Sequence, residues 1–226
     1  MPRSEYDELR AGFTAAVSHE LRTPLARLLA LLESAELPGA DLQALLRQAH
    51  DEVEEMTELV DDILFLSELE QDREVVSLGE TEAAPVLREL VAGLSERAEL
   101  AGITLDLRIE DEELRLPLRR RMLQIVAENL LVNVIRYAGE GATCTITLRR
   151  EGADGVLEVA DDGTGVPDED VPRLFERFFR SDRARTTRGS GLGLAIVKHV
   201  IESAGGNVEA RGGQSRGLDV RCSLPS

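Results

Sequence analysis

From residue 4 to about residue 70, apolar positions recur with the period of an α-helix, and the pattern breaks once, at ELPGAD over 36–41. One series repeats every seven residues, and a companion series runs with it, interrupted only by Glu52. The first series is Leu42, Ala49, Met56 and Ile63, and the companions are Leu45, Leu59 and Leu66. The pattern predicts two helices joined as a hairpin.

A second apolar series, formed by Leu46, Val53 and Val60, runs beside the first. One seam satisfies a contact between two helices, whereas two adjoining seams need more partners. We therefore expect two hairpins to pair into a four-helix bundle, which makes the protein a homodimer. Acidic residues fill the remaining positions and predict a solvated face: Asp51, Glu54, Glu55, Glu58 and Asp62.

The period changes after the stretch EQDREVVSLGETEAAP, which loses the seam and reads as a linker. Alternating runs predict strands at 103–110, 143–150, 156–163, 207–213 and 218–225, and helical patterns predict helices at 84–102, 119–139 and 192–206. Strands grouped between helices are typical of an α+β layer, a sheet covered by helices. The predicted organisation is a helical hairpin over 1–72, a linker over 73–82 and an α/β sandwich over 83–226.

Composition narrows the function classes. The chain has 226 residues and a net charge of −17, from 43 acids against 26 bases. This balance argues against nucleic-acid binding through a basic face. No run approaches the roughly 18 to 20 apolar residues of a membrane span, and no signal peptide opens the chain, so we expect a cytosolic piece. Cys144 and Cys222 lie in predicted strands and are expected to be buried thiols.

The stretch AVSHELRTPLARL places chemistry on the first helix. His19 and Thr23 lie one turn apart on one face, and Glu20 projects about 100° around the helix. Pro24 cannot donate to the carbonyl of Glu20, so we expect a bend beside the histidine. An imidazole beside a carboxylate is a nucleophile with a base, although a surface histidine on a kinked helix is equally consistent with these residues alone. The other histidines, His50 and His199, are expected to be structural or solvated.

Two glycine stretches have the pattern of phosphate-binding loops. DDGTGVP at 161–167 follows a predicted strand, and RGSGLGLAIVK at 188–198 opens a predicted helix. Glycines let backbone amides approach a phosphate, and a helix N-terminus favours negative charge. Neither stretch is a dinucleotide or P-loop fingerprint, and each alone is also consistent with a simple turn.

A third stretch, ENLLVNVIRYAG, places Asn129, Asn133, Arg136 and Tyr137 on one side of a helix. Two amides, a cation and an aromatic ring suit a magnesium-bound triphosphate better than a core, although an exposed polar face stays possible. The basic stretch SDRARTTRGS at 181–190 has the composition of a lid.

Taken together, five stretches resemble the sensor histidine kinases of two-component signalling. SHELRTPL resembles the family's phosphoacceptor box, NLLVNVIRYAG its asparagine box, DDGTGVP its first glycine box, LFERFFR its phenylalanine box and GSGLGLAIVK its second glycine box. They occur in the family's order over nearly the whole chain. One departure is Asp162, which stands where asparagine is frequent.

The resemblance implies a dimerisation and phosphotransfer hairpin followed by an ATP-binding sandwich of the kind found in gyrase and in the ninety-kilodalton chaperone. It implies that His19 accepts the γ-phosphate of ATP and that Glu20 takes the proton. The phosphate would pass to an aspartate on a response regulator, and Glu20 with Thr23 also fits a phosphatase reaction on that regulator.

The resemblance also assigns the nucleotide site. Asn133, assisted by Asn129, would hold Mg²⁺, and Asp161 would accept a hydrogen bond from the adenine amino group. The other implied nucleotide-binding residues are Gly163, Gly165, Gly189, Gly191, Leu192, Gly193, Arg136, Tyr137 and the lid arginines Arg185 and Arg188.

Asn129 separates two enzyme classes. The related ATPases place a glutamate base at this position, and an amide cannot take a proton from water. Glu128 points about 100° away around the helix. These residues favour a kinase over a nucleotide-gated ATPase, and a dimeric scaffold without catalysis stays a third alternative. By resemblance alone, the parent protein is expected to be anchored in the bacterial inner membrane through segments absent from this chain.

Overall fold

The computed structural model describes residues 3–71, 79–181, 189–213 and 216–226, with side chains from residue 17 onward in the first helix and up to residue 69 in the second. The chain divides into two compact units, Met1–Phe65 and Leu66–Ser226. No described helix is long and apolar enough to cross a membrane.

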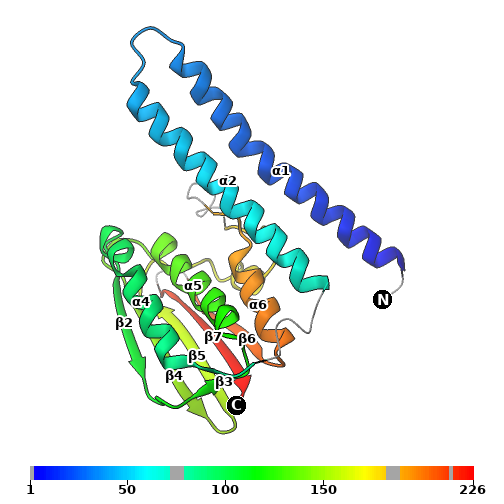
Figure 1. The fold of residues 1–226 in the computed structure, drawn as a ribbon, viewed down its shortest axis with the longest axis vertical. Coiled ribbons are helices and arrows are strands. Elements are labelled where there is room, and N and C mark those ends of the chain that lie inside the picture. The colour runs from blue at the N-terminus through cyan, green and yellow to red at the C-terminus, as the bar shows by residue number, and fades with distance from the viewer. Residues whose placement is uncertain (1–2, 72–78, 182–188, 214–215) are drawn as a thin grey trace. The chain divides into compact units, whose positions relative to one another are not determined.

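The first unit is the predicted helical hairpin. Helices α1 (Arg3–Ala35) and α2 (Leu42–Gln71) run antiparallel and side by side (Figure 1). In the turn between them, Asp41 accepts a hydrogen bond from the amide of Ala44 over 3.1 Å, which begins α2 with a side-chain cap.

The two apolar series of α2 have different surroundings in this hairpin. From Leu45 to Ile63 the apolar residues of the seven-residue series and its companions are half-buried or buried, with Leu59 only 5% exposed, whereas Leu42 at the start of α2 is 54% exposed. The second series stays exposed, with Leu46 at 68%, Val53 at 49% and Val60 at 40%. The first series therefore forms the contact between α1 and α2, and the second series is an apolar stripe on the outside of the hairpin.

The second unit is a mixed five-stranded sheet with three helices on one face (Figure 1). The strands follow the order β2-β4-β5-β7-β6, and only β2 and β4 are parallel. Their bounds are β2 Thr104–Ile109, β4 Thr143–Glu151, β5 Asp154–Asp161, β6 Asn207–Gly212 and β7 Leu218–Pro225. The helices are α4 (Ala83–Leu100), α5 (Arg120–Tyr137) and α6 (Gly193–Ser203), with a short 3₁₀ turn, η1, at Val171–Arg173.

Alternation along the strands separates the two faces of this sheet. Core-facing residues such as Ile146, Leu148 and Leu157 are at most 1% exposed. Cys144 and Cys222 also lie on this inner face as free thiols, and burial raises the pKa of each to about 12, which confirms them as buried thiols. The predicted fold, a helical hairpin followed by an α/β sandwich, is confirmed.

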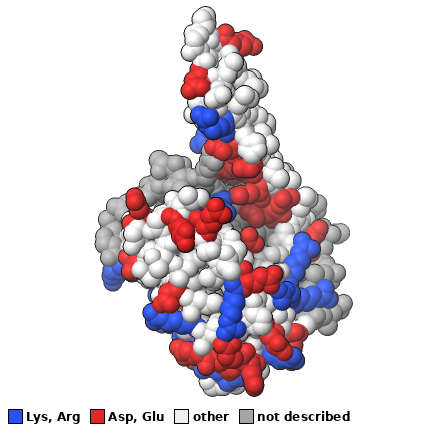
Figure 2. Space-filling model, turned by 60° about the vertical axis from the view of Figure 1, so that its left-hand side comes forward, with Lys and Arg blue, Asp and Glu red and all other residues white. Residues whose placement is uncertain are grey.

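The other face of the sheet is polar. Arg149 pairs with Glu158 of the neighbouring strand over 2.7 Å, and Arg221 pairs with Glu151 over 2.5 Å. On the face of the molecule in Figure 2, described basic and acidic side chains are interspersed over the second unit.

Two short strands were not predicted. β1 (Thr81–Glu82) pairs antiparallel with β3 (Arg115–Leu116), and the hydroxyl of Thr81 donates to the carbonyl of Leu118 over 2.6 Å. Residues 81–82, which the sequence placed at the end of the linker, are thus tied to the chain just before α5.

Candidate functional site

His19 is an exposed side chain of α1, with 76% of its surface accessible. Its Nδ1 lies 3.5 Å from Oε1 of Glu20, which is longer than an ordinary hydrogen bond. A carboxylate at Nδ1 favours the tautomer that carries its proton there, so that the Nε2 lone pair is left for an electrophile. An exposed imidazole and a half-buried carboxylate are therefore adjacent on α1.

Thr23 and Pro24 lie one turn further along. The Thr23 hydroxyl donates to the backbone carbonyl of His19 over 3.4 Å, and Thr23 is exposed. Pro24 is buried. The helix continues through it as one element from Arg3 to Ala35, so the expected bend does not interrupt α1. The helix thus carries a buried proline five residues after the exposed histidine.

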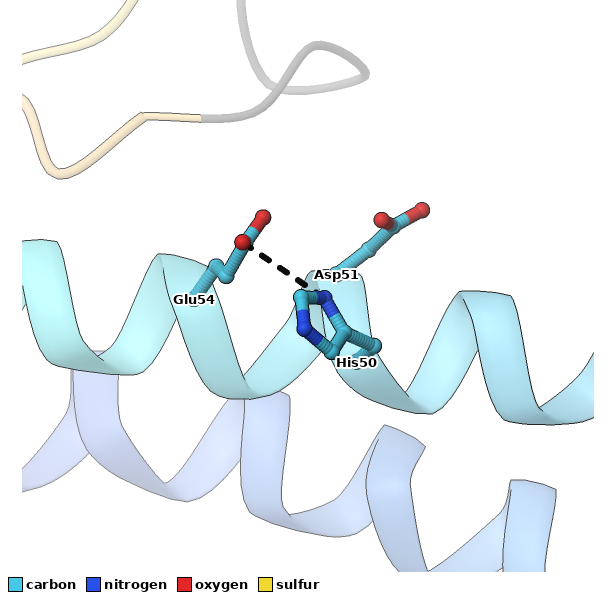
Figure 3. Close-up of side chains that lie close together, drawn as sticks. All are labelled: His50, Asp51 and Glu54. Atoms are coloured by element: carbon cyan, nitrogen blue, oxygen red, sulfur yellow. Dashed lines mark ion pairs between the residues drawn. The ribbon is translucent and has the colours of Figure 1, made fainter.

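The other two histidines lie beside polar groups of neighbouring residues. His50, Asp51 and Glu54 lie close together on α2 (Figure 3), and Nδ1 of His50 is 3.5 Å from Oε1 of Glu54. Exposed acidic groups of this kind are common without a bound metal ion. In the second unit, Nε2 of the half-buried His199 lies 3.4 Å from the carbonyl oxygen of Leu69.

Asn129 faces the start of α6. Its Nδ2 donates to the carbonyl of Ile125 over 2.9 Å, which fixes the orientation of the amide. A Cβ added at Gly193 would lie 2.5 Å from Oδ1 of Asn129, so only glycine fits there without a shift. Asn133, one turn along α5, is half-buried. The two asparagines bring amide oxygens, which are suitable ligands for Mg²⁺, to one side of the helix.

The second glycine stretch is pressed against the end of α5. Gly189 has φ +144°, and a Cβ there would lie 2.6 Å from the Tyr137 hydroxyl and 3.6 Å from Nη1 of Arg136. Gly191 has φ +69° and accepts a hydrogen bond from the amide of Phe178 over 3.0 Å. Positive φ and these close approaches require glycine at both positions.

The first glycine stretch begins at Asp161, which is half-buried. Its Oδ1 accepts a hydrogen bond from the amide of Gly163 over 2.9 Å. Burial raises the pKa of Asp161, while hydrogen bonds from the backbone of Gly163 and Leu218 act in the opposite direction. A Cβ at Gly163 would lie 2.2 Å from the carbonyl oxygen of Ala138, directly after α5.

Replacing Gly163 by alanine is expected to displace this loop, because the new methyl group would collide with backbone rather than with a flexible side chain. We expect a loss of about 1–3 kcal/mol in the free energy of unfolding and weaker ATP binding. Thermal denaturation and calorimetric titration with ATP measure both. Gly93→Ala, in α4 with open space around it, is the control and should not weaken either. Equal behaviour of the two variants would contradict the role of Gly163.

The structure brings most predicted nucleotide-site residues together around α5. Ala138 contacts the first glycine stretch at Gly163, Tyr137 contacts the second at Gly189, and Asn129 faces Gly193. Gly165, with φ +64°, and Leu192, fully buried, belong to the same two stretches. Arg185 and Arg188 lie outside the described residues. His19, Glu20 and Thr23 belong to the first unit and the nucleotide group belongs to the second.

Two residues with structural roles at the site were missed. Phe178 was quoted within a motif but given no role, yet its backbone adopts φ +61° and holds Gly191. Asp162, noted as a departure, accepts a hydrogen bond from the amide of Thr143 over 2.6 Å and so ties the first glycine loop to β4. A positive φ at a non-glycine residue leaves no periodic signal in a sequence.

Comparisons with known proteins agree with this geometry. The family model "His Kinase A (phospho-acceptor) domain" matches residues 9–72, and "Histidine kinase-, DNA gyrase B-, and HSP90-like ATPase" matches residues 119–226. The sensor-like histidine kinase SenX3 of Mycobacterium tuberculosis is 32% identical over 236 residues, which cover 99% of this chain and 56% of that protein. The chain thus spans about half the length of the curated relatives it matches.

Solved structures show the same fold. The histidine kinase ThkA in complex with the response regulator protein TrrA matches with a TM-score of 0.79 at 22% identity, over 99% of this chain and 64% of that chain. Full-length ShkA in complex with AMPPNP matches with a TM-score of 0.69 at 27% identity, over 93% of this chain and 45% of that chain.

Proposed function

The chain belongs to the sensor histidine kinases, and we propose from this premise that it transfers the γ-phosphate of ATP to His19 and from there to an aspartate of a response regulator. In this proposal, residues 1–72 form the dimerisation and phosphotransfer hairpin, 73–82 the linker and 83–226 the ATP-binding domain. The proposal rests on one observation: an exposed histidine lies beside a carboxylate, in a chain whose second unit packs two glycine loops against an amphipathic helix.

ATP is assigned to the second unit because its two glycine loops pack closely against α5 and the residue after it, where side chains would collide with neighbouring atoms. Asp161 would accept from the adenine amino group beside Gly163 and Gly165. The phosphates would meet the N-terminus of α6, where backbone amides and the helix dipole favour negative charge. Leu192, fully buried, fixes the start of that helix. Arg136 and Tyr137, beside Gly189, would contact phosphate and nucleoside. Arg185 and Arg188 are proposed to contact the terminal phosphate.

Mg²⁺ fits the amide oxygens of Asn133 and Asn129. When bound, the ion would neutralise charge on the phosphates and orient the γ-phosphate. In the transfer step, the Nε2 lone pair of His19 attacks the γ-phosphorus, the bond to the bridging oxygen breaks and ADP leaves. The imidazole then releases its Nδ1 proton to Glu20, which leaves a phosphoramidate with an uncharged ring and an anionic phosphoryl group.

Transfer to histidine is favoured over hydrolysis by Asn129. Its Nδ2 is held by the carbonyl of Ile125, and an amide cannot take a proton from water. Glu128, the neighbouring acid, is exposed on another side of α5. No described carboxylate of α5 therefore replaces the base that an ATPase needs.

The proposed activity is tested by incubating the protein with γ-labelled ATP and Mg²⁺ and then adding the receiver domain of a response regulator. A phosphoramidate resists alkali and is lost in acid, so label of this kind is expected on the protein before it moves to the receiver domain. ATP hydrolysis without labelled protein would favour the ATPase alternative. Binding of ATP without turnover would favour the scaffold.

A homodimer is part of the proposal, because the hairpin exposes apolar residues on both of its helices. On α1 they are Leu25, Leu29 and Leu32, and on α2 they are the apolar stripe of Leu46, Val53 and Val60, each at least 40% exposed. A second copy would bury both sets in a four-helix bundle.

Val53→Glu is expected to weaken the dimer by more than about tenfold, because a charge would be buried without a partner. Gln43→Glu, an exposed polar position of the same helix, adds the same charge outside the stripe and should leave the dimer intact. Sedimentation velocity measures both. A monomeric wild type, or dissociation of both variants, would contradict the assignment of the stripe.

A second activity concerns Thr23. Its exposed hydroxyl, one turn from His19, could orient a water against the phosphorylated aspartate of the regulator. Dephosphorylation of a response regulator by this site is therefore part of the proposal. The membrane anchor of the parent protein stays a prediction.

A further inference from the structure

Glu52 occupies a position in the hairpin where the sequence otherwise repeats apolar residues. It lies in the companion series between Leu45 and Leu59, and its side chain is only 13% exposed. The neighbouring seam residues Ala49 and Met56 are half-buried, and Leu59 is buried. A charged residue thus stands in the core contact between α1 and α2.

The contacts of this carboxylate are few. Oε1 lies 3.7 Å from Nη1 of Arg27 on α1, which is longer than a hydrogen bond, and the Arg27 side chain is 54% exposed. Oε2 is shielded from solvent and has no hydrogen-bond partner among the described residues. An ionised carboxylate can accept about four hydrogen bonds. Glu52 is therefore poorly compensated for its burial.

A second copy of the chain does not change this, because Oε2 is already shielded within one protomer. A buried charge without hydrogen bonds destabilises the packing around it, and well-packed apolar residues at such positions are often more stable. Separating the two helices locally would let water reach the carboxylate. The closed seam and a locally opened seam consequently differ less in free energy here than they would with leucine.

We propose that the buried carboxylate of Glu52 lets the α1–α2 contact open locally without unfolding of the protein. We further propose that this opening changes the backbone conformation around His19. Arg27 is eight residues beyond His19, about 12 Å along the helix axis. Motion at the pair is therefore close enough to reach the phosphoacceptor segment through a single continuous helix. This conformational device goes beyond the proposed phosphotransfer chemistry.

The test compares Glu52→Leu with Asp61→Leu. Both variants remove one negative charge from a chain of net charge −17, but Asp61 is exposed on α2. We expect Glu52→Leu to raise the unfolding midpoint by about 5 °C and to slow native-state amide hydrogen exchange at 17–24 and 49–59. Asp61→Leu should do neither. Glu52→Gln, which removes the charge but keeps a buried polar group, should raise the midpoint by less than Glu52→Leu.

Two results would overturn the proposal. A lower midpoint for Glu52→Leu would mean that the carboxylate stabilises the seam. A higher midpoint with unchanged exchange at 17–24 would mean that no local opening reaches His19. Neither measurement requires ATP turnover, so failure of this proposal is distinguishable from failure of the kinase function.

Discussion

Replacing His19 by glutamine is expected to abolish phosphorylation of the protein and to leave ATP binding unchanged. The glutamine amide has no nucleophilic lone pair on nitrogen, so no phosphoramidate can form. The His19 side chain is 76% exposed, and its one described side-chain contact is with Glu20, so its replacement leaves the packing of α1 intact. Incubation with γ-labelled ATP, together with an ATP titration of the same preparation, measures both quantities.

His50→Gln is the matched control. His50 is also exposed on a helix of the hairpin and also lies 3.5 Å from a carboxylate, that of Glu54. This variant should be labelled as fast as the wild type. Loss of label in both variants, or undiminished label in His19→Gln, would contradict the assignment of the phosphoacceptor.

Asp161→Asn is expected to weaken ATP binding by about 10- to 100-fold, the effect of losing a hydrogen bond to a charged group. The carboxylate already accepts hydrogen bonds from the backbone amides of Gly163 and Leu218. A third, from the adenine amino group, would exceed the acceptor capacity of one amide oxygen. The new NH₂ group would also meet another donor. Calorimetric titration with ATP gives the affinity directly.

The neighbouring carboxylate supplies the control. Asp162 uses Oδ1 to accept from the amide of Thr143, and asparagine keeps that acceptor. Asp162→Asn should therefore bind ATP like the wild type, although it removes the same charge from the same loop. If both variants bind equally well, Asp161 is not the adenine contact.

Much of the fold could be predicted because its two units have different periods. The seven-residue series from Leu42 to Ile63 and its companions predicted the hairpin, and the alternation around Ile146 predicted a sheet buried on one face. The short strands β1 and β3 could not be predicted, since two residues carry no period. The strand order, with β2 parallel to β4 at one edge, depends on tertiary contacts that no local pattern specifies.

The nucleotide site was predictable to the extent that glycine is informative. A Cβ at Gly163, Gly189 or Gly193 would collide with α5 or with the residue that follows it. Glycine is needed at these positions, and the glycines are visible in the sequence. The strained backbone of Phe178 and the tie between Asp162 and β4 leave no such mark. The sequence also showed Glu52 only as an interruption of a series, because its poor hydrogen bonding is a property of the packed hairpin.

The central claim is that the phosphate rests on His19, and the most direct measurement is to locate it. The wild-type protein is incubated with ATP and Mg²⁺, kept at neutral or alkaline pH, and fragmented by electron transfer in a mass spectrometer. We predict one phosphate on the imidazole of His19. Phosphate on any other residue, or ADP formation without a phosphorylated protein, would contradict the account.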